Sequence, residues 1–116
     1  MSNLAALDAE LNKMIAEGKA LEAFEKFYHD DCTMQENHEE PTVGKAKNRE
    51  RELAFFATVE ELHHLKLIGS AVGDDISFSE WDFDVTYKGS GRVRMAQVAR
   101  RTWRGGKVIA ERFYHK

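Results

Sequence analysis

The C-terminal part of the chain, from Gly73 onward, constrains the fold most, because glycine-rich turns separate three long segments of alternating apolar and polar side chains. The segments span residues 76–87, 92–104 and 107–115. The turns that precede them are Gly73-Asp74-Asp75, Gly89-Ser90-Gly91 and Gly105-Gly106. Long strands joined by tight glycine turns predict an antiparallel meander.

The part of the chain before Gly73 is mostly helical. Apolar residues at helical spacing predict a first helix that ends at Gly18 and a second that ends before residues 29–31. We expect an extended piece at residues 32–36, a loop at 37–44, a third helix at 45–59 with Leu53, Phe56 and Ala57 facing inward, and a long strand at 60–72. Helices followed by long strands predict one α+β domain over residues 1–116, in which a curved antiparallel sheet holds three helices against its concave face.

Charge and composition exclude several partners and compartments. The net charge is −3, from 17 basic and 20 acidic residues, and no basic cluster follows the pattern of a nucleic-acid binder. No apolar run approaches the roughly 20 residues that a membrane-spanning helix needs, so no membrane contact is expected. The single cysteine, Cys32, cannot form an internal disulfide, which favours a reducing, cytoplasmic location.

The faces of the strands predict an apolar pocket on the concave side of the curved sheet. Alternate side chains point to opposite faces, and the aromatic face of residues 76–87 must be covered by the helices. On the two following strands we place inward Val93, Met95, Gln97, Ala99, Arg101 and Trp103, and Ile109, Glu111, Phe113 and His115. The expected pocket lining is Trp81, Phe83, Val85, Tyr87, Gln97, Trp103, Glu111 and Phe113.

The outer face of the same strands carries charges of both signs. Its residues include Glu80, Asp82, Asp84, Arg94, Arg100 and Arg112. Such a face is able to pair with a second copy of itself about a two-fold axis, which predicts a homodimer. The alternative is a solvated monomer surface on which the charges form cross-strand ion pairs.

Arg101 and Glu111 are inward polar residues, and burial of such groups is costly unless they are paired. They form either a structural ion pair across two strands or a ligand-binding group. His63 and His64 are adjacent on a strand and are expected on opposite faces, which argues against a shared metal. An inward His63 is either a general base near neutral pH or an ordinary half-buried histidine. No metal site and no cofactor is expected.

The order of elements and three loose motifs resemble a known family. "FYHDDC" at residues 27–32 follows the second helix, a glycine precedes the third helix, and "GGKVIAERFYHK" at residues 105–116 ends the chain. This pattern resembles the SnoaL-like branch of the nuclear-transport-factor-2-like superfamily, also called the cystatin-like α+β cone. The resemblance implies a cone-shaped fold. The superfamily includes isomerases, polyketide cyclases, dehydratases, epoxide hydrolases and binding subunits, so the fold alone implies no single activity.

Ketosteroid isomerase, from the same superfamily, uses a carboxylate base, a protonated aspartic acid and a helical tyrosine. The resemblance places these three roles at Glu36, Ala99 and Leu11, so only the base has a counterpart and that reaction is not expected. Two functions remain: binding of a small apolar molecule, or an acid/base isomerase, cyclase or dehydratase acting on a hydrophobic carbonyl or polyketide-like compound. For the enzyme, Glu36 or His63 would take the proton and Arg101 would stabilise the oxyanion.

Overall fold

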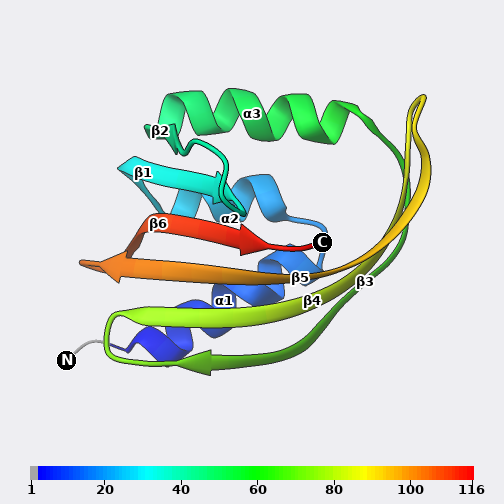
Figure 1. Cartoon of the computed structure of the whole chain (residues 1–116). Helices are drawn as coiled ribbons and strands as arrows, with labels where there is room; N and C mark the ends of the chain where they lie inside the picture. Colours follow the sequence, from blue (N-terminus) through cyan, green and yellow to red (C-terminus); the bar gives the residue numbers. More distant parts are fainter. Residues whose placement is uncertain (1–2) are drawn as a thin grey trace.

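The computed structural model describes residues 3–116, which form three helices and a six-stranded curved sheet (Figure 1). The predicted α+β class with three helices on a curved sheet is confirmed. The helices are α1 (Leu4–Ala16), α2 (Ala20–Phe27) and α3 (Lys45–Ala57). The strands are β1 (Tyr28–Glu36), β2 (Thr42–Val43), β3 (Val59–Val72), β4 (Ile76–Tyr87), β5 (Gly91–Arg104) and β6 (Lys107–Tyr114).

The sheet has the order β2-β1-β6-β5-β4-β3. Strands β3 to β6 form the antiparallel meander that the glycine turns predict. Gly105 and Gly106, in the turn between β5 and β6, both have positive φ, 58° and 79°, as a tight two-residue hairpin loop requires. Strand β1 begins directly after α2 and pairs in parallel with β6, a pairing that the strand pattern did not predict.

The core lies between the helices and the β1–β6–β5 part of the sheet. The ring of Phe27 meets Trp103 edge to face, with the ring centres 6.2 Å apart. Leu11 and Cys32 are fully buried. The residues of this core cluster are Leu4, Leu11, Ala23, Phe24, Phe27, Tyr28, Cys32, Met34, Trp103 and Val108. The apolar stripes that predict α1 and α2 therefore supply most of the helical residues of this core cluster.

The orientation of α3 differs from the one predicted, because a buried polar residue fixes it. The Nδ2 group of Asn48 donates hydrogen bonds to the carbonyl oxygens of Thr42 and Gly44, at 3.0 and 2.9 Å. These hydrogen bonds hold the start of α3 beside β1 and β2. The side chains one and two helical turns after Asn48 share its face of the helix and therefore point toward the sheet. The expected inward residues Leu53 and Ala57 are exposed, whereas Phe56 lines the cavity although 37% of it is exposed, so the predicted inner face was only partly right.

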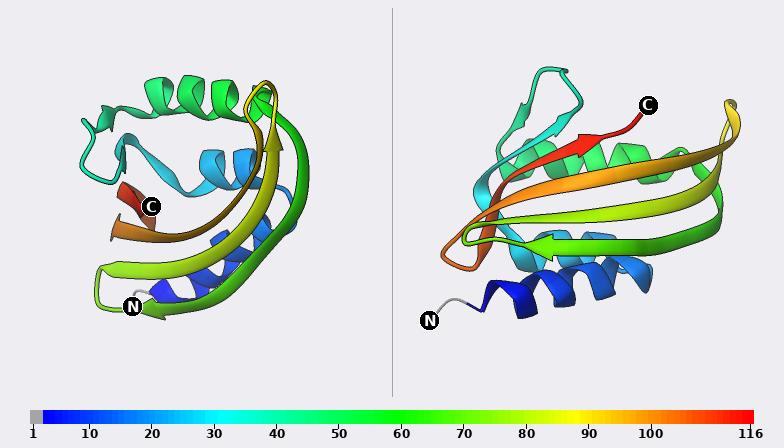
Figure 2. Two further views of the ribbon diagram at one scale, coloured as in Figure 1. Left: turned by 45° about the vertical axis from the view of Figure 1, so that its right-hand side comes forward. Right: turned by 60° about the horizontal axis from the view of Figure 1, so that its bottom comes forward.

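The long strands curve, and their far ends meet the end of α3 (Figure 2). There, the backbone N–H of Lys88, in the turn between β4 and β5, donates a 2.7 Å hydrogen bond to the carbonyl oxygen of Thr58, just after α3. Register shifts interrupt the β3–β4 ladder at three places and the β5–β6 ladder at one. Bulges of this kind bend a sheet and increase its local twist.

A bulge in the β5–β6 ladder changes which side chains face inward. Between Thr102 and Trp103 the β5–β6 register shifts, and Val108 enters the core with no exposed surface, while Ile109 is only partly buried. The predicted inward position of Ile109 is therefore wrong, because strict alternation does not hold across the bulge.

Within residues 3–116, none of the helices combines the length and the apolar character that crossing a membrane requires.

Candidate ligand cavity

A cavity of about 880 Å³ lies between the concave face of the sheet and the three helices. Its lining comes from α1, α2, α3 and every strand except β2. The walls are mainly apolar and aromatic, and include Trp81, Phe83 and Val85 on β4 and Met95 on β5. A space of this size matches the range that small-molecule sites occupy in proteins.

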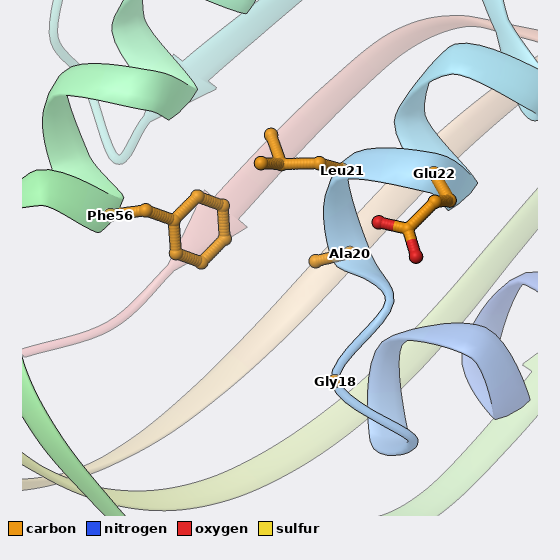
Figure 3. A pocket seen from close by; sticks show the side chains of 5 residues that line it. All are labelled: Gly18, Ala20, Leu21, Glu22 and Phe56. Carbon is orange, nitrogen blue, oxygen red and sulfur yellow. The ribbon is translucent and has the colours of Figure 1, made fainter.

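Exposed apolar side chains surround the mouth of the cavity. Phe55 and Leu62 line the cavity and are 45% and 50% exposed. A smaller hollow of about 100 Å³ adjoins this region, and Figure 3 shows Phe56 of α3 facing Leu21 of α2 across it. Gly18, Ala20 and Phe56 line both spaces, so the small hollow lies at the edge of the cavity.

Tyr28, Arg101 and Glu111 line the buried inner end of the cavity. They belong to a larger polar network, which we call the Arg101 network: Asp8, Asn12, Tyr28, Ser77, Arg101 and Glu111. The Arg101 guanidinium donates to Glu111 through Nε at 2.8 Å, and through Nη1 to Asp8 at 2.9 Å and to the side-chain oxygen of Asn12 at 2.7 Å. Ser77 donates to Asp8 at 2.8 Å. All six residues are buried, so α1 and the sheet are joined by charged hydrogen bonds that water does not reach.

Opposite charge maintains the ionised state of Arg101 inside this network. Burial acts to lower the pKa of Arg101, but the adjacent Glu111 carboxylate raises it above the ordinary value. The second Glu111 oxygen accepts a hydrogen bond from the Tyr28 hydroxyl. Burial, together with the Glu111 charge, raises the pKa of Tyr28 well above its ordinary value. Tyr28 therefore stays protonated and acts as a donor near neutral pH.

A second polar group lies nearer the solvent, where β1, α3 and β6 meet. Glu36 accepts from Arg51 at 2.5 Å through one carboxylate oxygen, and its other oxygen lies 2.8 Å from Nε2 of His115. All three residues line the cavity, and the Glu36 side chain is 30% exposed. Glu36, the predicted base, is thus held by two partners.

Glu52 is the cavity carboxyl with the fewest partners. It lies on α3, lines the cavity, and is 19% exposed. Its only hydrogen bond among residues 3–116 comes from Nη1 of Arg51, at 3.5 Å. Burial, reinforced by the nearby Glu111 carboxylate, raises the pKa of Glu52 from 4.5 to about 7. A carboxyl with such a pKa exists in both protonation states near neutral pH, which suits proton transfer.

The structure brings most of the predicted site residues together. The cavity is lined by Glu36 and Arg101 and by Trp81, Phe83, Val85, Tyr87, Gln97, Glu111 and Phe113. Trp103 instead lies in the core, where its indole N–H donates to Ser77 at 2.9 Å. Trp103 faces inward as predicted, but it does not line the cavity because Phe27 and the rest of the core cluster pack against it.

His63 also lies elsewhere. Its Nε2 is 2.7 Å from the Thr86 hydroxyl, on the face of β4 opposite the cavity, and His64 is 3.7 Å from Asp82 on that same outer face. A register shift between Leu62 and His64 puts both histidines outside, so the predicted inward position of His63 and the opposite faces are wrong. Among residues 3–116, no three or more His, Cys, Asp or Glu side chains are arranged to hold a metal ion.

Sequence reasoning missed Glu52, Tyr28, Asp8 and Asn12. Asp8 and Asn12 are spaced four apart in the helical stripe of Leu4 and Leu11, so polar residues inside an apolar stripe were the available signal. Glu52 follows Asn48 by one turn, but the apolar residues next to it suggested a different inner face. No local signal distinguished Tyr28 from the aromatic residues of α2.

Comparison with known proteins places the whole chain in one group of folds. A family model described as a SnoaL-like domain matches residues 3–115. A crystal structure from Mesorhizobium loti, provisionally named a SnoaL-like polyketide cyclase [carbohydrate phosphatase], superposes with a TM-score of 0.89 at 29% identity and covers 97% of this chain and 99% of that one.

Two more distant structures share the fold. A protein from Jannaschia sp. CCS1, also provisionally named a SnoaL-like polyketide cyclase, has a TM-score of 0.83 at 11% identity, with 100% of this chain and 90% of that chain covered. A provisional isomerase from Bacillus subtilis has a TM-score of 0.82 at 13% identity, with 99% and 90% covered. No functionally curated protein sequence matches the chain.

Proposed function

The chain belongs to the SnoaL-like domain family, and on that basis we propose that its cavity binds a small, largely apolar molecule. The observation that carries this proposal is the cavity of about 880 Å³ between the sheet and the helices. Aromatic walls would cover the apolar body of a ligand, and the polar residues where α3 faces β1 and β6 would meet its polar group. Exposed Phe55 and Leu62 at the mouth provide an apolar entrance.

The arrangement favours a ligand whose polar atoms are few and lie at one end. The walls near Trp81, Phe83 and Met95 offer mainly apolar contact, with Gln97 as the polar residue beside them, whereas the charged residues gather where α3 faces β1 and β6. A polar atom placed against the aromatic walls would lose its hydrogen bonds to water without replacement. The ligand is therefore expected to enter with its apolar part contacting β4 and β5 and its polar group toward α3.

Binding can be tested with a neutral fluorescent probe, N-phenyl-naphthylamine, and one matched pair of variants. Gln97→Trp puts an indole into the cavity from β5. Ala96→Trp puts the same indole on the outer face, because adjacent strand residues point to opposite sides and Ala96 is exposed. The wild type and Ala96→Trp should enhance probe emission, and Gln97→Trp should not, while circular dichroism shows all three folded.

Two results would contradict the binding proposal. The first is a wild type that leaves the emission of the probe unchanged at all protein concentrations. The second is a folded Gln97→Trp variant that binds the probe as tightly as the wild type, which would place the probe outside the cavity.

A second candidate function is acid/base catalysis, and the raised pKa of Glu52 favours it. Glu52 would take or return a proton next to a carbonyl carbon of an apolar substrate. Arg101 is a weaker choice for stabilising the oxyanion than the sequence suggested, because Glu111 and Asp8 already pair with it. Glu36 is held by Arg51 and His115, which leaves Glu52 as the freer base.

Proton transfer can be measured without the natural substrate. Tetralone is an apolar ketone whose α-hydrogens exchange with deuterium in D₂O, and nuclear magnetic resonance follows the exchange. The wild type should accelerate it with a midpoint near pH 7, and Glu52→Gln should abolish the acceleration. Equal rates for the two proteins would reject Glu52 as the base and leave the binding proposal intact.

A further inference from the structure

The positive charges in the cavity already have close partners, whereas the negative charge of Glu52 has only a long contact with Arg51. Arg51 pairs with Glu36 at 2.5 Å. Arg101 pairs with Glu111 at 2.8 Å and with Asp8 at 2.9 Å. The ionisable residues of the lining, within residues 3–116, are Glu36, Arg51, Glu52, Arg101, Glu111, His115, Tyr28 and Tyr87, with no lysine among them. Carboxylates therefore outnumber the arginines, and the excess falls on Glu52.

The position of Glu52 makes its negative charge unfavourable unless a cation binds beside it. It is 19% exposed, its one hydrogen bond from Arg51 is long at 3.5 Å, and that arginine is more closely bound to Glu36. The neighbouring carboxylates of Glu36 and Glu111 repel its charge. The raised pKa of Glu52 agrees with this geometry.

The apolar part of the lining also suits a cation. Phe55 stacks edge to face on Tyr87 with ring centres 5.8 Å apart, and both residues line the cavity. Trp81, Phe83 and Phe113 contribute further rings to the same wall. Ring faces attract ammonium groups, most strongly where water is excluded.

From this arrangement we propose that the ligand of the cavity is an apolar molecule with a protonated amine, which forms an ion pair with the Glu52 carboxylate. The proposal rests on the proposed binding function and adds the chemical class of the ligand. The amine would supply the positive charge that the cavity lacks, and the aromatic walls would hold the carbon skeleton. A carboxylate ligand is disfavoured, since both arginines of the lining are already paired.

A neutral carbonyl ligand is the main competitor, and the two differ in pH dependence. An amine needs Glu52 ionised, so its affinity rises as pH increases through about 7. A carbonyl oxygen accepts a hydrogen bond from protonated Glu52, so its affinity falls over the same range. The other ionisable groups that share the lining with Glu52 are Arg51 on α3, Glu36 and Tyr28 on β1, Tyr87 on β4, Arg101 on β5, Glu111 on β6, and His115 just after β6.

The test uses three probes with one skeleton: naphthylethylamine, naphthylethanol and naphthylpropionate. Calorimetry at pH 6 and pH 8 gives the dissociation constants for the wild type and two variants. Glu52→Gln removes the charge, and Glu50→Gln removes an exposed charge from the same helix. For the wild type at pH 8 we expect the amine to bind at least about ten-fold tighter than the alcohol, and propionate to bind weakest.

At pH 6 the affinity for the amine should drop by about ten-fold, because the ionised fraction of a group with a pKa near 7 falls by that factor. Glu52→Gln should lose both the amine preference and the pH dependence, and Glu50→Gln should keep both. Alcohol and amine binding equally at pH 8, or an amine preference that survives Glu52→Gln, would overturn the amine proposal while leaving the binding function standing. No binding of any probe would contradict the binding function itself.

Discussion

Glu52→Gln should stabilise the fold at high pH and have little effect at low pH. The change replaces a carboxyl that is 19% exposed with an uncharged amide of nearly the same shape. Because the folded-state pKa is raised from 4.5 to about 7, the folded protein holds this proton more tightly than the unfolded chain does. The stability that Glu52 contributes is thus complete below pH 4.5 and is lost as pH rises through 7.

The expected size of the effect follows from the rise in pKa. A rise from 4.5 to about 7, at about 1.4 kcal/mol for each pH unit, costs the wild-type fold roughly 3 kcal/mol once Glu52 is ionised. Glutamine avoids that cost. For a chain of this length the melting temperature of the variant at pH 8 should be about 10 °C higher than that of the wild type.

The assay is urea denaturation of the wild type, Glu52→Gln and Glu50→Gln at several pH values between 4 and 8. The difference in free energy of unfolding between the wild type and Glu52→Gln should grow with pH, since groups common to both proteins cancel. Glu50 is exposed on the same helix, so Glu50→Gln should follow the wild type. Parallel curves for the wild type and Glu52→Gln would refute the account of Glu52.

Two further predictions concern the Arg101 network and the outer face. Arg101→Met should lower the free energy of unfolding by roughly 3–5 kcal/mol in urea denaturation, because Glu111 and Asp8 stay buried without their cation. A small loss of stability combined with weakened ligand binding would instead favour a ligand-binding role for Arg101. We also propose that the outer sheet face forms a homodimer, and sedimentation at micromolar concentration should show it; a single 13.3 kDa species would reject it.

Alternation and turn chemistry predict the meander well, because both act over neighbouring residues. Every second residue of β4 from Trp81 to Tyr87 lines the cavity, as the pattern predicts. The outer charges of β4 and β5 do form cross-strand pairs, with Arg92 2.8 Å from Asp84 and Arg94 3.5 Å from Asp82. The resemblance to the SnoaL-like family added the cone and the lining role of Glu36.

The failures arise from register shifts and side-chain hydrogen bonds that residue type and spacing do not reveal. A bulge in the β3–β4 ladder moves His63 to the outer face, and no residue type near it announces the shift. The face of α3 is set by hydrogen bonds from Asn48 to the loop before the helix, which outweigh an apolar stripe of three residues. Glu52 enters the cavity as a consequence of that docking.

The Arg101 network makes the two ends of the cavity mechanically different. At the inner end, charged hydrogen bonds tie α1 to β5 and β6, so small displacements there would break several strong contacts together. At the mouth, Leu62 is half exposed, and the Phe55 ring, which packs edge to face on Tyr87, is held by apolar contact rather than by charged hydrogen bonds. Selectivity for the ligand's polar group should therefore be strict, whereas tolerance for the length and shape of its apolar tail should be broad.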